Sequence, residues 1–389
     1  MRLPELDTAR IHYRFLGTTA LDRFLDLPEG PVVYVAVDAG VVELASIFDH
    51  TSFPGLPGWD LLVEAGGREV VIRDDDRGEP IPPHLADPLS TFSWDPRRRA
   101  FGDPSGLYPV LKEARRRIRE TLSRKGTTLG DVEPVDIGEY PEVRDVLSGI
   151  DGVAAAVYTA RLPIVFPRKL LRLGENDPGH PATYHRFVVT GILTGPWAER
   201  GLELLRKTGY TAAVLPELDV MHGTEHSKEG HPEGDVWRHS IETLRYRKTR
   251  DLTIALALLF HDSGKPRSRP QGHKKFDGHA DIGAGIARDV LERLEFAPET
   301  VDAVRWLVKY HMIPGALRRL PDHRRDPIMR SELFPLLLEV YRCDLSSTFR
   351  GPENYYDACA IYRRFLKSNR DPASGSPREF RDLVNTYLN

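Results

Sequence analysis

Short runs of β-branched and other apolar residues alternate with turn residues in the first part of the chain. Three runs, at residues 32–37, 61–64 and 69–72, consist mainly of valine, leucine and isoleucine and are bounded by turn residues. Such runs predict short strands. Gly66-Gly67 separates the second run from the third, and two glycines permit the positive φ angles of a tight hairpin. The pattern therefore predicts a sheet that includes a hairpin.

A helical pattern replaces these strand signals further along the chain. Leu107 to Lys125 is typical of a helix with one strongly basic face. After about residue 130, helical periodicity dominates, with glycines and prolines marking the loops. We expect further helices at residues 143–158, 184–207, 235–247, 251–261, 279–294, 298–310, 330–346 and 355–367.

These elements predict an α+β protein with a β-containing front and an all-α back. We expect an N-terminal mixed sheet with helices at residues 1–130, an all-α neck at 131–222 and an all-α domain at 223–389. The length of 389 residues agrees with this division, because a chain of that size exceeds one typical core.

Composition narrows the class of protein without naming a function. Hydrophobic residues make up 40% of the chain and the formal net charge is −3, so no global positive field indicates a nucleic-acid partner. The chain has only two cysteines, Cys343 and Cys359, which excludes a disulfide framework. The charged N-terminus does not resemble a signal peptide, and no apolar run reaches the ~18 residues of a membrane span. We therefore expect a cytoplasmic protein with no membrane partner.

Histidines concentrate in one part of the chain. Nine of the fourteen lie between residues 222 and 323, and several stand where a helix meets a loop. The adjacent pair His261-Asp262 follows a wholly apolar helical stretch that Gly264 and Pro266 bring to an end. His239 and His279 stand at the beginnings of predicted helices, His311 at an end, and Asp344 within one.

Imidazole and carboxylate groups together suit divalent transition metals. We predict that His239, His261, Asp262 and Asp344 bind one ion, and that Asp262, His279 and His311 bind a second. Two ions about 3.5–4 Å apart that share a carboxylate can activate water and clamp a phosphate. Asp262 and Lys265 are the predicted catalytic residues, Lys265 as a point charge for a phosphate oxygen. The residues do not distinguish Mn, Fe, Co, Ni, Mg and Zn, or one ion from two.

Four blocks in this region carry a family resemblance. HPEGDVWRHS, LALLFHDSGKP, FDGHADIGA and LVKYHM, followed by Asp344, match the order H…HD…H…H…D. This order resembles the HD phosphohydrolase superfamily, and more narrowly the HD domain of bacterial tRNA nucleotidyltransferases and poly(A)-polymerase-like proteins. The resemblance covers residues 223–348 and implies metal-dependent hydrolysis of a phosphate ester.

The front of the chain resembles the catalytic domain of the same nucleotidyltransferases, but with departures. That family has a GG-x-VRD turn and a DxD carboxylate pair on a later strand. Residues 34–40 stand at the place of the turn without paired glycines or the Arg-Asp, and residues 58–64 resemble the carboxylate strand with only Asp60 retained. The arginines of a third motif, RRDFTINA, are missing from residues 84–87. The resemblance implies a degenerate nucleotidyltransferase-like mixed sheet.

The basic helix offers a candidate contact for RNA. Lys112, Arg115, Arg116 and Arg119 can bind phosphates of an RNA strand. Acidic neighbours such as Glu113 and Glu120 also allow a simple solvated face. We expect the nearby Tyr108 and Trp94 to belong to the core rather than to a stacking surface.

The sequence therefore predicts a metal-dependent phosphohydrolase, a phosphodiesterase or phosphatase, that uses a metal-activated water. Its expected substrate is a nucleotide or an RNA-terminal phosphate. Two alternatives remain: a tRNA or RNA nucleotidyltransferase of the CCA-adding or poly(A)-polymerase type, using carboxylates such as Asp38 with Asp60, and a non-catalytic RNA- or nucleotide-binding protein with structural metals. The sequence does not separate a monoester from a cyclic diester substrate, and it does not indicate the oligomeric state.

Overall fold

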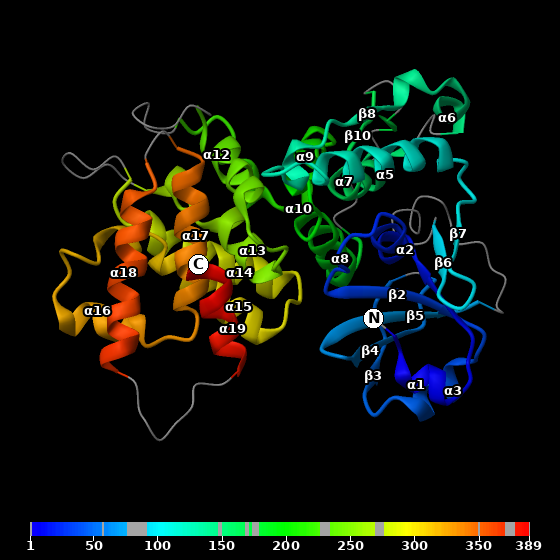
Figure 1. Ribbon diagram of the computed structural model, residues 1–389, viewed down its shortest axis with the longest axis horizontal. Helices are drawn as coiled ribbons and strands as arrows, with labels where there is room; N and C mark the ends of the chain where they lie inside the picture. Colours follow the sequence, from blue (N-terminus) through cyan, green and yellow to red (C-terminus); the bar gives the residue numbers. More distant parts are fainter. Residues whose placement is uncertain are drawn as a thin grey trace. The chain divides into compact units, whose positions relative to one another are not determined.

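The protein is described by a computed structural model (Figure 1). The structure describes residues 2–56, 58–75, 92–146, 150–167, 171–172, 179–225, 234–268, 276–348, 351–369 and 378–388. The chain folds into two compact units, Met1–Val214 and Leu215–Asn389. The finer division at residues 130 and 222 stays a prediction.

A seven-stranded mixed sheet forms the framework of the first unit. Its strand order is β3-β4-β5-β2-β1-β6-β7. The strands are β1 (Tyr13–Leu16), β2 (Val32–Val37), β3 (Thr51–Ser52), β4 (Leu61–Ala65), β5 (Arg68–Asp74), β6 (Ser93–Asp95) and β7 (Ala100–Gly102). The central strand β2 pairs in parallel with β5 and antiparallel with β1, and all six of its residues are buried. The α+β fold class is thus confirmed.

The predicted glycine hairpin is confirmed. β4 and β5 pair in antiparallel register from Leu61 opposite Ile72 to Ala65 opposite Arg68. Gly66 and Gly67 have φ angles of 58° and 70°. A two-residue hairpin turn of type I′ needs such positive values at both positions.

Helices cover both faces of the sheet. Val33, Val35 and Val37 of β2 share a core with Leu6 of α1 (Pro4–Thr8) and Leu44 of α3 (Val41–Ile47). Helix α2 (Gly17–Phe24) belongs to a second core with α5 (Tyr108–Leu122) and α7 (Gly152–Arg161), and in Figure 1 it lies on the face of the sheet opposite α1 and α3. Val33, Val35 and Val37 lie on the same face of β2 because successive side chains of a strand point to opposite faces.

The remainder of the first unit is mainly helical. Its helices are α5 (Tyr108–Leu122), α6 (Pro141–Val146), α7 (Gly152–Arg161), α8 (Ala182–Leu193), α9 (Ala198–Lys207) and α10 (Tyr210–Val214). Two small parallel sheets, which the sequence analysis did not predict, join β8 (Val135–Asp136) to β10 (Ile164–Val165) and β9 (Ile150–Asp151) to β11 (Leu171–Arg172).

Two predicted helices are each divided in the structure. The expected helix at 143–158 becomes α6 and α7, and the Asp151 side chain accepts hydrogen bonds from Val153 N and Ala154 N at the start of α7. Such an N-cap fixes a helix beginning. The expected helix at 184–207 is divided between α8 and α9 at Gly195, where a Cβ atom would meet the backbone of Ala160.

Helices make up the second unit. They are α11 (Pro216–Asp219), α12 (Val236–Thr243), α13 (Leu252–Phe260), α14 (His279–Arg293), α15 (Pro298–Tyr310), α16 (Asp322–Met329), α17 (Phe334–Ser346), α18 (Glu353–Ser368) and α19 (Arg378–Leu388). Helix α13 is central: its residues from Ile254 to Phe260 are buried, and it packs against α12, α14, α15 and α17. Among the described residues, the helices are too short or too polar for any of them to cross a membrane.

Candidate metal centre

The six predicted metal ligands lie at helix ends around α13. His239 lies near the start of α12, where the Asp235 side chain accepts a hydrogen bond from Arg238 N at 2.7 Å. His261 and Asp262 directly follow α13, His279 is the first residue of α14, His311 directly follows α15, and Asp344 lies in the last turn of α17. Because α13 packs against the other four helices, these ends meet at one point.

One group of side chains gathers on one oxygen of Asp262. The Nε2 atoms of His239 and His261 lie 3.2 Å apart, and they lie 3.6 and 3.2 Å from Asp262 Oδ2. Asp344 Oδ1 lies 3.0 Å from His239 Nε2 and 3.8 Å from His261 Nε2. His239, His261 and Asp262 can therefore offer donor atoms to one ion.

A second group gathers on the other oxygen of the same carboxylate. The Nε2 atoms of His279 and His311 lie 3.4 Å apart, and they lie 3.5 and 4.0 Å from Asp262 Oδ1. Asp262 thus stands between two sets of imidazoles, with one oxygen directed to each set. This is the arrangement that a bridging carboxylate requires.

Hydrogen bonds on the far side of the rings set the histidine tautomers. Nδ1 of His261, His279 and His311 lies 2.7, 2.8 and 2.7 Å from the backbone carbonyl oxygens of Leu258, Phe276 and Val308. A carbonyl only accepts hydrogen bonds, so each Nδ1 carries the proton and each Nε2 carries a lone pair.

The convergence of these lone pairs fits a cation. Nε2 atoms without protons face one another and a carboxylate in a buried space. A divalent ion satisfies such a donor set. When one ring nitrogen of a histidine binds a metal, a hydrogen bond from the other ring nitrogen to a carbonyl is its usual support. The residues present are therefore compatible with one or two divalent ions, whose identity the donor set does not decide.

Burial keeps His279 and His311 in their neutral form. It lowers the pKa of His311 to about 3, with the nearby His261 adding to the effect. Burial also lowers the pKa of His279. Burial alone would raise the pKa of Asp344, but the hydrogen bond with His239 lowers it. At neutral pH, His279, His311 and Asp344 therefore have the protonation states that metal binding requires.

Lys265 lies beside Asp262. Its Nζ donates to Asp262 Oδ2 at 2.5 Å, and its side chain is 9% exposed. The ammonium group also lies 5.5 Å from the centre of the Phe276 ring. Lys265 therefore contacts the oxygen that faces His239 and His261, and its role as a charge for a phosphate oxygen stays a prediction.

The structure differs from the resemblance at residues 34–40, where a turn was expected. Residues 34–37 lie inside β2 instead of forming a turn. A strand, a glycine of φ 51° and a helix occur earlier, at β1, Gly17 and α2. Asp22 stands five residues after Gly17, the spacing from the first glycine to the aspartate in GG-x-VRD. Gly17 and Asp22 thus have the spacing of the first glycine and the aspartate in that motif.

The same region lacks a carboxylate pair on the strand that follows the turn. β2 follows α2 and reads VVYVAV. Asp22 is buried, and its Oδ2 accepts a hydrogen bond from Arg161 Nη1 at 2.8 Å. The third motif position, at residues 84–87, lies outside the described residues.

Three aspartates gather along one edge of the sheet, the edge formed by the carboxyl ends of β2 and β5. Asp38 follows β2, Asp74 ends β5, and Asp60 precedes β4, whose strand pairs with β5. Asp74 N donates to Asp60 Oδ2 at 2.8 Å, and Asp38 Oδ2 lies 3.2 Å from His12 Nδ1. The carboxyl ends of parallel β2 and β5 therefore bring Asp38 to the same edge as Asp60 and Asp74.

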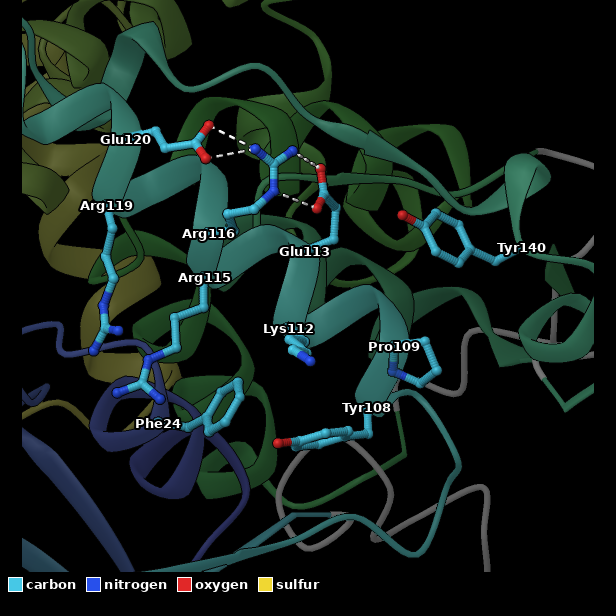
Figure 2. A pocket seen from close by; sticks show the side chains of 10 residues that line it. All are labelled: Phe24, Tyr108, Pro109, Lys112, Glu113, Arg115, Arg116, Arg119, Glu120 and Tyr140. Carbon is cyan, nitrogen blue, oxygen red and sulfur yellow. Dashed lines mark hydrogen bonds and ion pairs between the residues drawn. The ribbon is translucent and has the colours of Figure 1, made fainter.

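The predicted basic face lies on α5 and lines a pocket (Figure 2). Lys112, Arg115, Arg116 and Arg119 all contribute to it. Tyr108 also lines the pocket and is 49% exposed, so the expectation that it belongs to the core is wrong. Trp94 is partly buried and packs against the core as expected.

Comparison with known proteins gives two kinds of match. The model of the HD domain family matches residues 236–333. The CC-adding tRNA nucleotidyltransferase of Thermus thermophilus is 34% identical over 198 residues, which are 48% of this chain and 43% of that protein. The A-adding tRNA nucleotidyltransferase of Deinococcus radiodurans is 34% identical over 175 residues, 42% of this chain and 38% of that protein.

Solved structures also resemble the chain. The crystal structure of the Bacillus stearothermophilus CCA-adding enzyme in complex with CTP superposes with a TM-score of 0.47 at 15% sequence identity. The superposition covers 94% of this chain and 80% of that one.

These relatives contradict the predicted phosphohydrolase function. They are named as tRNA nucleotidyltransferases and multifunctional CCA proteins, which favours the nucleotidyltransferase alternative. The error has a physical cause: the HD pattern identifies a metal-binding arrangement of helices, and a shared arrangement does not fix the reaction of the whole protein. The chain carries an HD domain in its second unit and is related in sequence to tRNA nucleotidyltransferases over about half of its length.

Proposed function

We propose that this protein adds nucleotides to the 3′ end of a tRNA or tRNA-like RNA. The observation that carries the proposal is the 34% identity to a CC-adding tRNA nucleotidyltransferase over 198 residues. The matched segments span 43% and 38% of the first two relatives. The proposal therefore extends the activity of the whole relatives to this chain.

The carboxylates at the edge of the large sheet support the proposal. Nucleotidyl transfer needs carboxylates that hold Mg²⁺ against the triphosphate, and the ions neutralise charge during transfer. Asp38 is exposed, and Asp60 and Asp74 are partly exposed at the same edge. Asp60 also accepts a hydrogen bond from Asp74 N, which holds its side chain at this edge.

The test is incorporation of labelled CTP and ATP into tRNA transcripts that lack all or part of the 3′ CCA. We expect Mg²⁺-dependent incorporation, lowered about a hundredfold or more in Asp60→Asn, because a group that stabilises transferring charge typically contributes that much. Asp49→Asn, which alters an exposed carboxylate between α3 and β3, is the matched control. Incorporation that is equal in all three proteins would exclude this carboxylate edge as the site.

A second candidate function is RNA binding without transfer. It is favoured by one observation: β2, the strand after the Gly17 turn, carries no carboxylate. Tight binding of the same transcripts without incorporation of any nucleotide would favour this alternative over transfer.

We also propose that His239, His261, Asp262, His279, His311 and Asp344 bind one or two divalent ions. The split of the Asp262 oxygens between two sets of imidazoles supports this assignment. The test is metal analysis of desalted protein after incubation with Mn²⁺, Fe²⁺, Co²⁺, Ni²⁺, Zn²⁺ or Mg²⁺. Asp262→Asn should lose all bound metal, and His279→Ala should lose one of two ions.

Asp281→Asn is the matched control for the metal measurement. Asp281 lies in the first turn of α14, and its side chain is 74% exposed. Its metal content should equal that of the wild-type protein. Unchanged metal content in Asp262→Asn would show that the ions bind elsewhere.

A further inference from the structure

A pocket of about 500 Å³ opens beside α5 in the first unit (Figure 2). Its volume lies within the range of about 300–1,000 Å³ of sites for small molecules. It is lined by Phe24, Tyr108, Pro109, Lys112, Glu113, Arg115, Arg116, Arg119, Glu120 and Tyr140. Aromatic rings and cationic groups therefore meet in one concave surface.

The aromatic side of the pocket has one half-exposed ring. Phe24 is 4% exposed and stacks on Phe101 with ring centres 4.3 Å apart. Tyr108 lies next to it, with ring centres 6.0 Å apart, and is 49% exposed. An exposed ring held beside a fixed one is a surface on which a nucleic-acid base can stack.

The cations of the pocket are only partly neutralised. Arg116 is bound on both sides by Glu113 and Glu120, and Arg117 also binds Glu113. Arg115 and Arg119 share the single carboxylate of Asp26.

Lys112 is exposed and makes no ion pair with the residues that the structure describes. Lys112, with two arginines sharing one carboxylate, leaves positive charge in excess on this side of α5. Such excess charge suits a phosphate group.

Asp26 holds the place that an anion would take. Its Oδ2 accepts hydrogen bonds from Arg115 at 2.9 Å and from Arg119 at 2.6 Å. Burial alone would raise the pKa of Asp26, but these hydrogen bonds and the arginine charges lower it. The side chains of Asp26 and Arg119 are 57% and 60% exposed, so a phosphate can compete with this carboxylate.

We propose that the α5 pocket binds an unpaired nucleotide of an RNA strand, with its base against Tyr108 and its phosphate at Lys112 and Arg119. The inference rests on the proposed function in one respect, because it takes RNA as the ligand. It adds a binding site on a helix that is separate from the carboxylate edge and from the histidine cluster.

The length of the cationic row favours a strand over a free nucleotide. Lys112 and Arg119 are seven residues apart on α5, which is roughly 10 Å along a helix. Arg115 lies between them on the pocket side. A row of this length suits successive phosphates of a backbone better than the single phosphate of a mononucleotide.

The test is binding of fluorescently labelled single-stranded RNA to the full chain, measured by anisotropy over a range of salt concentrations. Tyr108→Ala should weaken binding about tenfold, because stacking on an aromatic ring contributes that order of affinity. Tyr108→Phe should bind as the wild type does. Lys112→Ala should lower the slope of log affinity against log salt by about 0.7, the value for one contact to a single-strand phosphate.

Two further variants sharpen the test. Asp26→Asn should tighten binding, because it removes the carboxylate that competes for Arg115 and Arg119. Lys125→Ala removes the same charge from an exposed position just beyond α5 and outside the pocket lining, and should leave the salt slope unchanged. Unfolding temperatures identify any variant that fails to fold.

The outcomes separate this inference from the proposed function. Three results would each overturn the pocket assignment. The first is wild-type affinity and salt slope in folded Tyr108→Ala and Lys112→Ala. The others are failure of the wild-type protein to bind the RNA, and binding of AMP and CTP but not of RNA. Pocket-dependent RNA binding without nucleotide incorporation would support the pocket and overturn transfer. Nucleotide incorporation by a protein whose RNA binding does not depend on the pocket would support transfer and overturn the pocket.

Discussion

At the scale of single residues, Lys265 places a positive charge beside the histidine cluster. Its ammonium group lies 2.5 Å from Asp262 Oδ2, the oxygen that also faces His239 and His261. A fixed cation at this oxygen repels a second cation through a buried, weakly screening medium. Lys265 therefore opposes metal binding at the first group of ligands.

We predict that Lys265→Gln tightens binding of a divalent ion at least tenfold, or about 1.4 kcal/mol. Isothermal titration with Mn²⁺ or Co²⁺ measures the change. Lys309→Gln, which removes an equal charge that is 45% exposed on α15, is the control and should change affinity little. Weaker metal binding in Lys265→Gln would show that the ammonium group supports the site instead.

At the scale of elements, α5 depends on carboxylates that bind some of its arginines. Hydrogen bonds from Arg116 and then Arg117 lower the pKa of Glu113 from 4.5 to about 2. A carboxylate with a lowered pKa in the folded state stabilises the protein above its unfolded pKa. That stabilisation is lost as the pH falls through the window from 4.5 to about 2.

We predict that Glu113→Gln lowers the unfolding temperature at pH 6, and that the difference from the wild type shrinks as the pH falls from 5 to 3. Thermal unfolding followed by circular dichroism measures both effects. Glu133→Gln, at an exposed position after α5, should show neither. A difference that stays constant with pH would mean that Glu113 acts through packing alone.

The approach of α14 to the end of α13 depends on a glycine. A Cβ atom on Gly264 would lie 2.7 Å from Gly283 N and 2.9 Å from the carbonyl carbon of His279, and closer still to the carbonyl oxygen of His279. These neighbours are backbone atoms and cannot rotate away. The close approach of His279 to the end of α13 therefore requires that residue 264 lack a side chain.

We predict that Gly264→Ala destabilises the protein by about 1–3 kcal/mol, as overpacking of a core does, and weakens metal binding by moving His279. Gly285→Ala, in the same helix α14, is the control, since nothing lies within 4 Å of its added Cβ. It should stabilise the protein by roughly 0.5–1 kcal/mol through helix propensity. Urea unfolding and metal titration check both variants.

At the scale of the whole molecule, the two compact units should respond differently to metal. All six predicted ligands belong to the unit Leu215–Asn389. A ligand that binds only the folded state stabilises the unit that binds it, by about 2.7 kcal/mol at a hundredfold excess over its dissociation constant.

We predict that divalent metal raises the transition of the second unit in calorimetry of the full chain and leaves that of the first unchanged, and that a chelator reverses the shift. Arg161→Met identifies the first unit's transition, because it removes the guanidinium group that pairs with buried Asp22. Equal shifts of both transitions would contradict a metal site confined to the second unit.

Elements with strong local signals could be predicted from the sequence. The Gly66-Gly67 hairpin, α5 and α13 follow from turn chemistry and apolar runs that act over a few residues. β1 was missed because four residues that include an arginine give little signal, and its pairing with β2 and β6 decides its conformation. The division of α6 from α7 had a local signal, the N-cap Asp151, which the predicted helix at 143–158 overlooked.

The sequence by itself determined which residues form the candidate metal centre, because the adjacent His261-Asp262 and the order of the other ligands are local features of the chain. Only the tertiary structure decided how they act together. His239 and Asp344 meet across 105 positions of sequence, and packing of helices around α13 directs one oxygen of Asp262 to each pair of imidazoles. It also decided that Tyr108 is exposed beside Lys112. Local signals fix where an element begins and ends, whereas side chains far apart in sequence meet only when the apolar faces of their elements are buried together.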